Sequence, residues 1–301
     1  MPVPILAGLN MLMTPAILIA IVLGALAHIL WWAYGSLLND YYDQDIDRHH
    51  PHGEKVFTMG YFSDAQKRRL VLGFAVVAAL LEIPQVACIL ATHSNGLMDV
   101  AAFATVIGVG FVMGTMYSAP PLRTRVRMLG ATYSLMFVFV IAFLRFAILV
   151  GGLEFVQNNA LYIAGICLFM YMSHGITSVA LKDIPDAFSD RTGGVKSIPL
   201  VCGFRPALYV SVLILISTMA LGALFVLLGW VQWWFLISYA GAIVYIYLFR
   251  ETNEWIRGIS ADSDHWRRVP LRKTHHTFGY LVNWGVWIPC LMLAFNSRLL
   301  Y

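Results

Sequence analysis

Long apolar runs, each close to the length of a membrane-crossing helix, constrain the fold of this chain more than any other feature. A helix needs about 20 predominantly apolar residues to span the hydrocarbon core of a bilayer. Such runs cover roughly 14–38, 66–92, 97–117, 129–151, 159–182, 204–229, 231–250 and 277–296. We therefore expect an all-α fold, a polytopic membrane bundle of about eight transmembrane helices, with a single domain over residues 1–301.

The composition excludes a soluble globular domain. Hydrophobic residues make up 59% of the chain and charged residues only 12%, whereas soluble domains carry about 25% charged residues. The polar segments between the apolar runs are too short to fold alone, and the four cysteines show no metal-site or redox spacing. The chain is therefore expected to be an integral membrane protein.

Positive charge gathers on one side of the expected bundle. The segments after the first, third, fifth and seventh helices, with the adjoining helix ends, hold all of the 20 Lys and Arg residues except Arg145 and Arg298. Cytoplasmic loops of membrane proteins carry such an excess. We therefore expect the protein in the cytoplasmic membrane, with these loops on the cytoplasmic side.

Two acidic clusters follow apolar runs on that same side. The first contains Asn39, Asp43 and Asp47, and the second contains Asp183, Asp186 and Asp190. Members of the first cluster recur every four residues, so a continued helix would present them on one face. Carboxylates at the end of a membrane helix are costly unless a cation compensates them. The pair of clusters favours Mg²⁺ held against a diphosphate, because Mg²⁺ is usually bound by one or two carboxylates together with substrate phosphates.

Other functions fit acidic groups in a membrane protein less well. One cluster alone would be equally consistent with carboxylates that solvate a loop or pair with nearby arginines. A transporter is a second alternative, but transporter sites lie near the bilayer midplane, whereas these clusters lie at helix ends. An intramembrane enzyme that acts on a prenyl diphosphate is therefore the leading hypothesis.

Three motifs, taken in order, resemble those of the UbiA superfamily of intramembrane prenyltransferases. The first acidic motif is Asn39-Asp40-x-x-Asp43-x-x-x-Asp47. The second acidic motif lies far downstream and runs from Lys182-Asp183-Ile184-Pro185-Asp186 through Asp190-Arg191 to Lys196-Ser197. Between them, Tyr117-Ser118-Ala119-Pro120-Pro121-Leu122-Arg123 is similar to a loop of chlorophyll synthase-like members, while the Lys-Asp-Ile-Pro-Asp opening is closer to homogentisate prenyltransferases. The resemblance implies a helical bundle around a central cavity. It also implies Mg²⁺-dependent transfer of a polyprenyl group from an allylic diphosphate to an aromatic, porphyrin-type or other lipid acceptor.

The chemistry and the resemblance together assign roles to residues on the motif-bearing side. Asp43 and Asp190 are the expected catalytic residues, within a Mg²⁺-binding set of Asn39, Asp43, Asp47, Asp183, Asp186 and Asp190. The side chains expected to contact the substrate are Lys55, Tyr117, Arg123, Lys182, Arg191 and Lys196. Arg125 and Arg127 are interpreted as membrane-surface charges, and Glu82 and Arg145 as a pair or as snorkelling charges without chemistry. The expected partners are a prenyl diphosphate, a hydrophobic acceptor and the lipid bilayer, with no nucleic acid and no obligate protein partner.

The chain departs from the family pattern in two places. The family usually has nine membrane helices with the first motif after the second, whereas only about 38 residues precede Asn39 here. A non-catalytic or altered-function homologue therefore stays open, although both acidic motifs are retained. The Arg-Pro-rich stretch expected after the first motif is replaced by 53–60, where Lys55 supplies a point charge without the bidentate fork of arginine.

Overall fold

A computed structural model describes residues 15–48, 55–176 and 183–241, together with 250, 253, 254 and 257. The described helices that are long and apolar enough to cross a membrane are Pro15–Tyr42, Asp64–Thr92, Gly96–Ser118, Phe137–Asn158 and Phe204–Leu227. A shorter apolar helical stretch covers Ala160–Ser173. The expected all-α membrane fold is therefore confirmed for this part of the chain.

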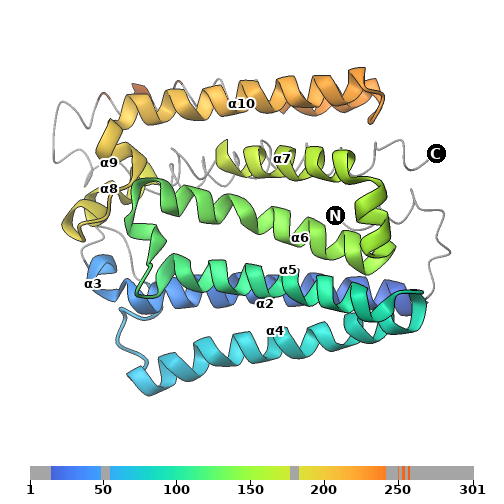
Figure 1. Ribbon diagram of the computed structural model, residues 1–301. Coiled ribbons are helices and arrows are strands. Elements are labelled where there is room, and N and C mark those ends of the chain that lie inside the picture. The colour runs from blue at the N-terminus through green and yellow to red at the C-terminus, as the bar shows by residue number, and fades with distance from the viewer. Residues whose placement is uncertain are drawn as a thin grey trace.

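The long helices lie side by side, and successive ones run in opposite directions (Figure 1). In chain order they are α2 (Pro15–Tyr42), α4 (Asp64–Thr92), α5 (Gly96–Ser118), α6 (Met128–Asn158), α7 (Ala160–Ile176) and α10 (Phe204–Leu227). Helix α2 packs against α4, α5 against α6, and α7 against both α6 and α10. The short elements α3 (Gln44–Asp47), η1 (Thr124–Val126), α8 (Asp183–Thr192) and α9 (Ile198–Cys202) gather at one end of the bundle. This arrangement brings both acidic motifs to that end.

Local sequence signals explain where two of the long helices begin and end. Helix α4 begins with a capping box, in which the Ser63 hydroxyl accepts from the Gln66 amide at 3.4 Å and Gln66 Oε1 accepts from the Ser63 amide at 2.9 Å. Helix α5 ends at Ser118, directly before Pro120 and Pro121, which disfavour a continued helix. Both boundaries fall within three residues of those expected from the sequence.

Helix α6 extends past the expected end at residue 151 because its kink is stabilised from another helix. Gly152 adopts φ 72° and ψ −179° inside α6, which frees backbone groups from the helical pattern. The Leu153 amide donates to Asp99 Oδ1 at 2.7 Å, and His93 Nδ1 is hydrogen-bonded to Asp99 Oδ2 at 2.8 Å. A Cβ at position 152 would lie only 2.7 Å from Asp99 Oδ2. The kink therefore depends on a glycine and on a carboxylate from α5.

Three other expected helices are described only in part or lie outside the described residues. The expected 159–182 helix corresponds to α7, which is described from Ala160 to Ile176, while 177–182 lies outside the described residues. In the expected 231–250 helix, the described element is a 3-10 helix, η3 (Trp233–Gly241), rather than an α-helix. The expected 277–296 helix lies outside the described residues.

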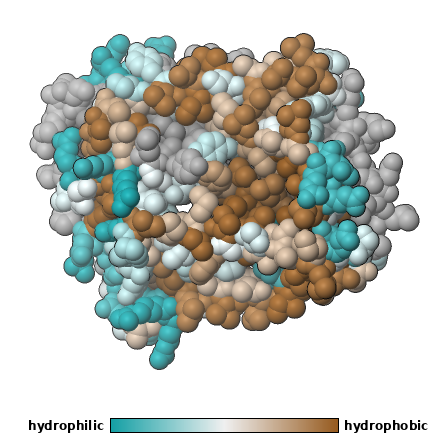
Figure 2. All heavy atoms as spheres, viewed as in Figure 1, coloured by the Kyte–Doolittle hydropathy of each residue, from teal (hydrophilic) through white to brown (hydrophobic). Residues whose placement is uncertain are grey.

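The outer surface of the bundle is predominantly apolar across its middle. Figure 2 shows hydrophobic residues across the centre of the visible face and hydrophilic residues toward its sides. Large hydrophobic side chains such as Ile19, Leu72 and Leu213 are exposed on α2, α4 and α10. Such a surface is stable in lipid, where exposed apolar side chains carry no hydration cost.

Candidate active site

The first acidic motif occupies the junction between α2 and α3. Asn39 lies in the last turn of α2, Asp43 in a one-residue break, and Asp47 at the end of α3. The Asp43 amide donates to the Asn39 carbonyl at 2.9 Å, and the Asp47 amide donates to the Asp43 carbonyl at 2.8 Å. Helical hydrogen bonding therefore continues across the break. Both carboxylates are buried, with Asp43 0% and Asp47 4% exposed.

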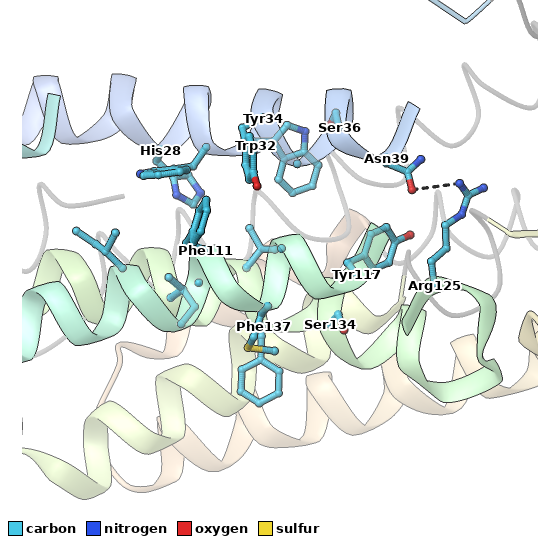
Figure 3. A pocket seen from close by; sticks show the side chains of 18 of the residues that line it. His28, Trp32, Tyr34, Ser36, Asn39, Phe111, Tyr117, Arg125, Ser134 and Phe137 are labelled. Carbon is cyan, nitrogen blue, oxygen red and sulfur yellow. Dashed lines mark hydrogen bonds between the residues drawn. The ribbon is translucent and has the colours of Figure 1, made fainter. Parts of the chain in front are cut away.

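Arg125 joins the first motif to the second. Its Nη1 donates to Asn39 Oδ1 at 3.1 Å and forms an ion pair with Asp43 Oδ2, while its Nη2 lies 3.5 Å from Asp190 Oδ1. Figure 3 shows the contact between Asn39 and Arg125. Arg125 is only 8% exposed. Our interpretation of Arg125 as a membrane-surface charge is therefore wrong, because the loop after α5 carries this side chain inward between the two motifs.

The fold of that loop explains the position of Arg125. Arg123 adopts a left-handed conformation with φ 36° and ψ 60°, which turns the chain into η1. Gly130 allows η1 to approach the start of α6, since a Cβ there would lie 2.4 Å from the Thr124 carbonyl oxygen. The Lys196 amide donates to the Val126 carbonyl at 3.0 Å. The segment after α8 is thus attached directly to η1.

Arg123 provides a second guanidinium group beside Asp43. Its Nη2 donates to Asp43 Oδ1 at 2.7 Å and to the Tyr42 carbonyl at 3.0 Å. The Arg123 side chain stays 31% exposed, whereas that of Asp43 is fully buried. Arg123 therefore lies at the surface of the site, where it is accessible to a ligand, and charge-assisted contacts of this kind are strong and orient their partners.

The second acidic motif lies on α8, which packs against α3. Asp183 and Asp190 are both buried. Helix α3 and the end of α8 approach closely, since a Cβ at Gly193 would lie 2.5 Å from Ile46 Cγ1. Other members of the expected site differ in position: Arg191 and Lys196 are exposed, while Lys182 and the side chain of Asp186 lie outside the described residues.

A cavity of about 310 Å³ opens beside the first motif and continues between α2, α5 and α6. Its outer end is polar and includes Asn39, Asp40, Lys55, Tyr117 and Arg125. Its wall is largely aromatic and aliphatic, with Trp31, Trp32, Tyr34, Phe111, Phe137 and Ile141. Its inner end is lined by His28 and Arg145. Figure 3 shows Asn39, Tyr117 and Arg125 at one end of this cavity and His28 at the other.

Two of the expected substrate contacts lie at the polar end of the cavity. Lys55 Nζ is 3.6 Å from Asp40 Oδ1, and both residues line the cavity. Tyr117, at the end of α5, is buried and also lines it. Lys55, Tyr117 and Arg123 are therefore all close to the first acidic motif, as their expected roles require.

The side-chain oxygens at this end of the bundle are the type of ligand that Mg²⁺ prefers. Buried carboxylate oxygens and the Asn39 amide oxygen are hard oxygen ligands. Within the described ranges, no group of three or more His, Cys, Asp or Glu side chains is gathered as a complete metal cage. A complete cage is not required, because Mg²⁺ at phosphate sites usually takes one or two carboxylates and completes its shell with phosphate oxygens and water. Asp43, Asp190 and Asn39 fit that requirement.

Comparison with known proteins places the chain in a family. The model of the UbiA prenyltransferase family matches residues 1–258. This chain belongs to that family. The UbiA-family match makes the protein a membrane prenyltransferase and confirms the enzyme class expected from the motifs.

Relatives of this UbiA-family protein include archaeal enzymes. It is 26% identical over 231 residues to a digeranylgeranylglyceryl phosphate synthase of Halobacterium salinarum, a match that covers 73% of this chain and 71% of the relative. A solved UbiA homologue from Archaeoglobus fulgidus, bound to DMAPP and Mg²⁺, has a TM-score of 0.56 at 18% identity, covering 95% of this chain and 92% of that one. A solved digeranylgeranylglyceryl phosphate synthase has a TM-score of 0.58 at 15% identity, covering 98% and 91%. These two structures show that the fold is shared.

Proposed function

We propose that this single-domain chain, over residues 1–301, is a Mg²⁺-dependent enzyme that transfers a polyprenyl group from an allylic diphosphate to a hydrophobic acceptor and releases diphosphate. The observation that carries this proposal is the position of Arg125, which contacts Asp43 and Asp190 and lines the polar end of the cavity. One residue thus links both acidic motifs to a cavity suited to an apolar chain. The solved homologues with DMAPP or GPP and Mg²⁺ support the same ligand classes.

In this proposal the diphosphate lies at the polar end of the cavity and the prenyl chain lies along its apolar wall. Mg²⁺ would be held by Asn39, Asp43 and Asp190, supported by Asp47, Asp183 and Asp186, and would supply charge neutralisation at the diphosphate. Arg123 and Arg125 would donate to diphosphate oxygens as negative charge develops on the leaving group. The remaining expected contacts are Lys55, Tyr117, Lys182, Arg191 and Lys196.

The aromatic wall would protect the reacting carbon from water. Tyr34 and Phe111 are stacked with ring centroids 5.5 Å apart, and Trp31 meets Phe111 edge-on at 5.5 Å. These rings come from α2 and α5 and face the cavity between those helices. Aromatic faces stabilise nearby cations, and a dry wall limits hydrolysis of a reactive allylic intermediate. The arrangement therefore favours transfer to an acceptor over loss of the prenyl group to water.

A product assay by mass spectrometry tests the proposal. Purified protein in lipid nanodiscs would receive two- to four-unit prenyl diphosphates and a panel of phenolic, porphyrin-type and glyceryl phosphate lipid acceptors. The name of the Halobacterium relative is the reason for including the last class. We expect one donor–acceptor pair to give a prenylated product with equimolar diphosphate, and EDTA to stop the reaction. Absence of product and diphosphate from every pair would contradict transfer, and full activity in EDTA would contradict the metal requirement.

Replacing Arg123 by alanine is expected to weaken use of the prenyl donor. The change removes one charge-assisted donor at the polar end of the cavity, which corresponds to about 1.5–3 kcal/mol. The loss should appear in kcat/KM for the donor with every acceptor tested, because the contact is made to the diphosphate. Arg123→Lys keeps the charge and lacks the planar fork, so its kcat/KM for the donor should lie between the values for wild type and Arg123→Ala. A variant with unchanged donor use and altered acceptor preference would assign this loop to the acceptor instead.

Cysteine labelling tests the proposed cytoplasmic position of the acidic end. Tyr61 lies before α4 at that end and is 77% exposed, whereas Leu97 lies at the start of α5 at the opposite end and is 81% exposed. In a background that lacks Cys202 and Cys290, Leu97→Cys should react with a membrane-impermeant maleimide in intact cells. Tyr61→Cys should react only after the cells are permeabilised. The reverse pattern would show that the acidic end faces outward.

A further inference from the structure

An ion pair lies deep in the bundle, at the inner end of the cavity. Arg145 Nη1 on α6 donates to Glu82 Oε1 on α4 at 2.8 Å. Arg145 is 2% exposed and lines the cavity together with His28. Neither charged residue belongs to the acidic motifs or to the proposed diphosphate site, yet charges within a membrane bundle are rare and costly unless they are paired.

The surrounding groups hold this pair in place. Trp31 Nε1 donates to Glu82 Oε1 at 3.1 Å, and Gln85 Nε2 donates to Glu82 Oε2 at 2.5 Å. Arg145 Nη2 also donates to the carbonyl oxygen of Gly24. Gly24 leaves room for this network, since a Cβ there would lie 2.6 Å from Gln85 Oε1 and 3.2 Å from the Phe146 ring. The ion pair is thus fixed between α2, α4 and α6.

The distance from the polar mouth to this pair corresponds to a short prenyl chain. His28 and Asn39 mark the two ends of the cavity on α2, and at 1.5 Å rise per residue they are about 16 Å apart. Ser134 and Arg145 mark a similar length on α6. Consecutive Cα atoms are joined by three bonds in an extended, trans arrangement and lie 3.80 Å apart. On the same scale, an isoprene unit adds four bonds to the length of a prenyl chain and spans about 5 Å when extended. The cavity therefore accommodates roughly three extended units, or four when the chain bends.

We propose that the Glu82–Arg145 pair forms a polar floor that limits the length of the prenyl donor. This inference rests on the proposed function, because it concerns the same cavity. An apolar chain that reached beyond the floor would have to separate two buried charges and leave each without its partner, which is strongly unfavourable. Donors of three or four isoprene units fit above the floor, and longer donors are excluded by it.

The double variant Glu82→Leu/Arg145→Leu tests the floor. Replacing both members of a buried ion pair by apolar residues is usually tolerated, whereas removal of one member is not. The variant should gain on the order of tenfold in its use of five- and six-unit donors relative to three-unit donors, a change typical of a resized apolar pocket. Glu82→Asp is the matched control, because it keeps both charges of the floor and should keep the wild-type length profile. Ile107→Phe, which adds bulk near the inner end, should shift use toward two-unit donors.

The outcomes separate the floor from the proposed function. Wild-type protein is assayed first with donors of two to six units, and absence of transfer from all of them would overturn the proposed function itself. If the wild-type protein does transfer a prenyl group, a folded double variant that keeps the wild-type preference for donor length would overturn the floor. A double variant that changes only its acceptor preference would also overturn it. If the double variant elutes as an aggregate or loses its thermal transition, Glu82→Met/Arg145→Met is assayed in its place. Gained use of five-unit donors by this second apolar pair supports the floor, and an unchanged length profile contradicts it.

Discussion

Replacing Arg125 by alanine is expected to abolish prenyl transfer and to destabilise the end of the bundle that carries both acidic motifs. Asp43 is fully buried and Asp190 is 3% exposed, and Arg125 contacts both carboxylates. Removing the cation leaves these buried charges less compensated, and loss of one partner of a buried pair costs about 3–5 kcal/mol. The variant should therefore unfold at lower temperature than wild type and should release no diphosphate in the product assay.

Two further variants separate the geometry of Arg125 from its charge. Arg125→Lys keeps one positive charge, but a single ammonium group cannot reproduce the forked contacts to Asn39, Asp43 and Asp190, so intermediate stability and low activity are expected. Arg127→Ala removes an exposed arginine two residues away, and its unfolding free energy should stay within about 0.5 kcal/mol of wild type. Wild-type activity and thermal stability in Arg125→Ala would contradict the central place of this residue.

Asp43→Asn and Asp190→Asn are each expected to reduce kcat/KM by roughly a thousandfold, which corresponds to about 4 kcal/mol of lost transition-state stabilisation. The amide keeps the size of the side chain while removing a negative charge that would hold Mg²⁺ against the diphosphate. Circular dichroism and elution in detergent should remain those of the wild type.

Asp45→Asn is the matched control for these two variants. Asp45 lies in the same motif, but its side chain is 95% exposed and pairs with Arg48 at 3.8 Å. Exposed pairs of this kind contribute little, so this variant should keep nearly full activity. Near-normal transfer by either Asp43→Asn or Asp190→Asn would contradict the role of the two motifs in the reaction.

The long helices and the shared position of the motifs could be predicted from the sequence because both depend on local patterns. Apolar runs of span length fix the helices, and the number of helices between the motifs fixes the end at which each motif lies. The spacing of Asn39, Asp43 and Asp47 likewise predicted their helical register, which persists across the break at Asp43. Of the two alternatives for Glu82 and Arg145, a pair or snorkelling charges, the structure shows the pair.

Features that depend on contacts between distant segments could not be predicted in the same way. Arg125 and Arg127 occupy similar positions in the sequence, yet one is buried and the other exposed. The difference arises from the left-handed turn at Arg123 and from the close approach at Gly130, neither of which has a periodic signal. The kink at Gly152 similarly depends on Asp99, which lies on a different helix. Local periodicity contains no information about such partners.

The most direct test of the central claim is whether Asp43 and Asp190 bind one donor together. Isothermal titration of geranylgeranyl diphosphate in the presence of Mg²⁺ would be measured for wild type, Asp43→Asn, Asp190→Asn and the double variant. If the two motifs form a single site through Arg125, each single variant should lose nearly as much binding free energy as the double variant, with a coupling energy of about 0.5–3 kcal/mol. Independent, additive losses from the two substitutions would show that the motifs act separately and would contradict the shared site.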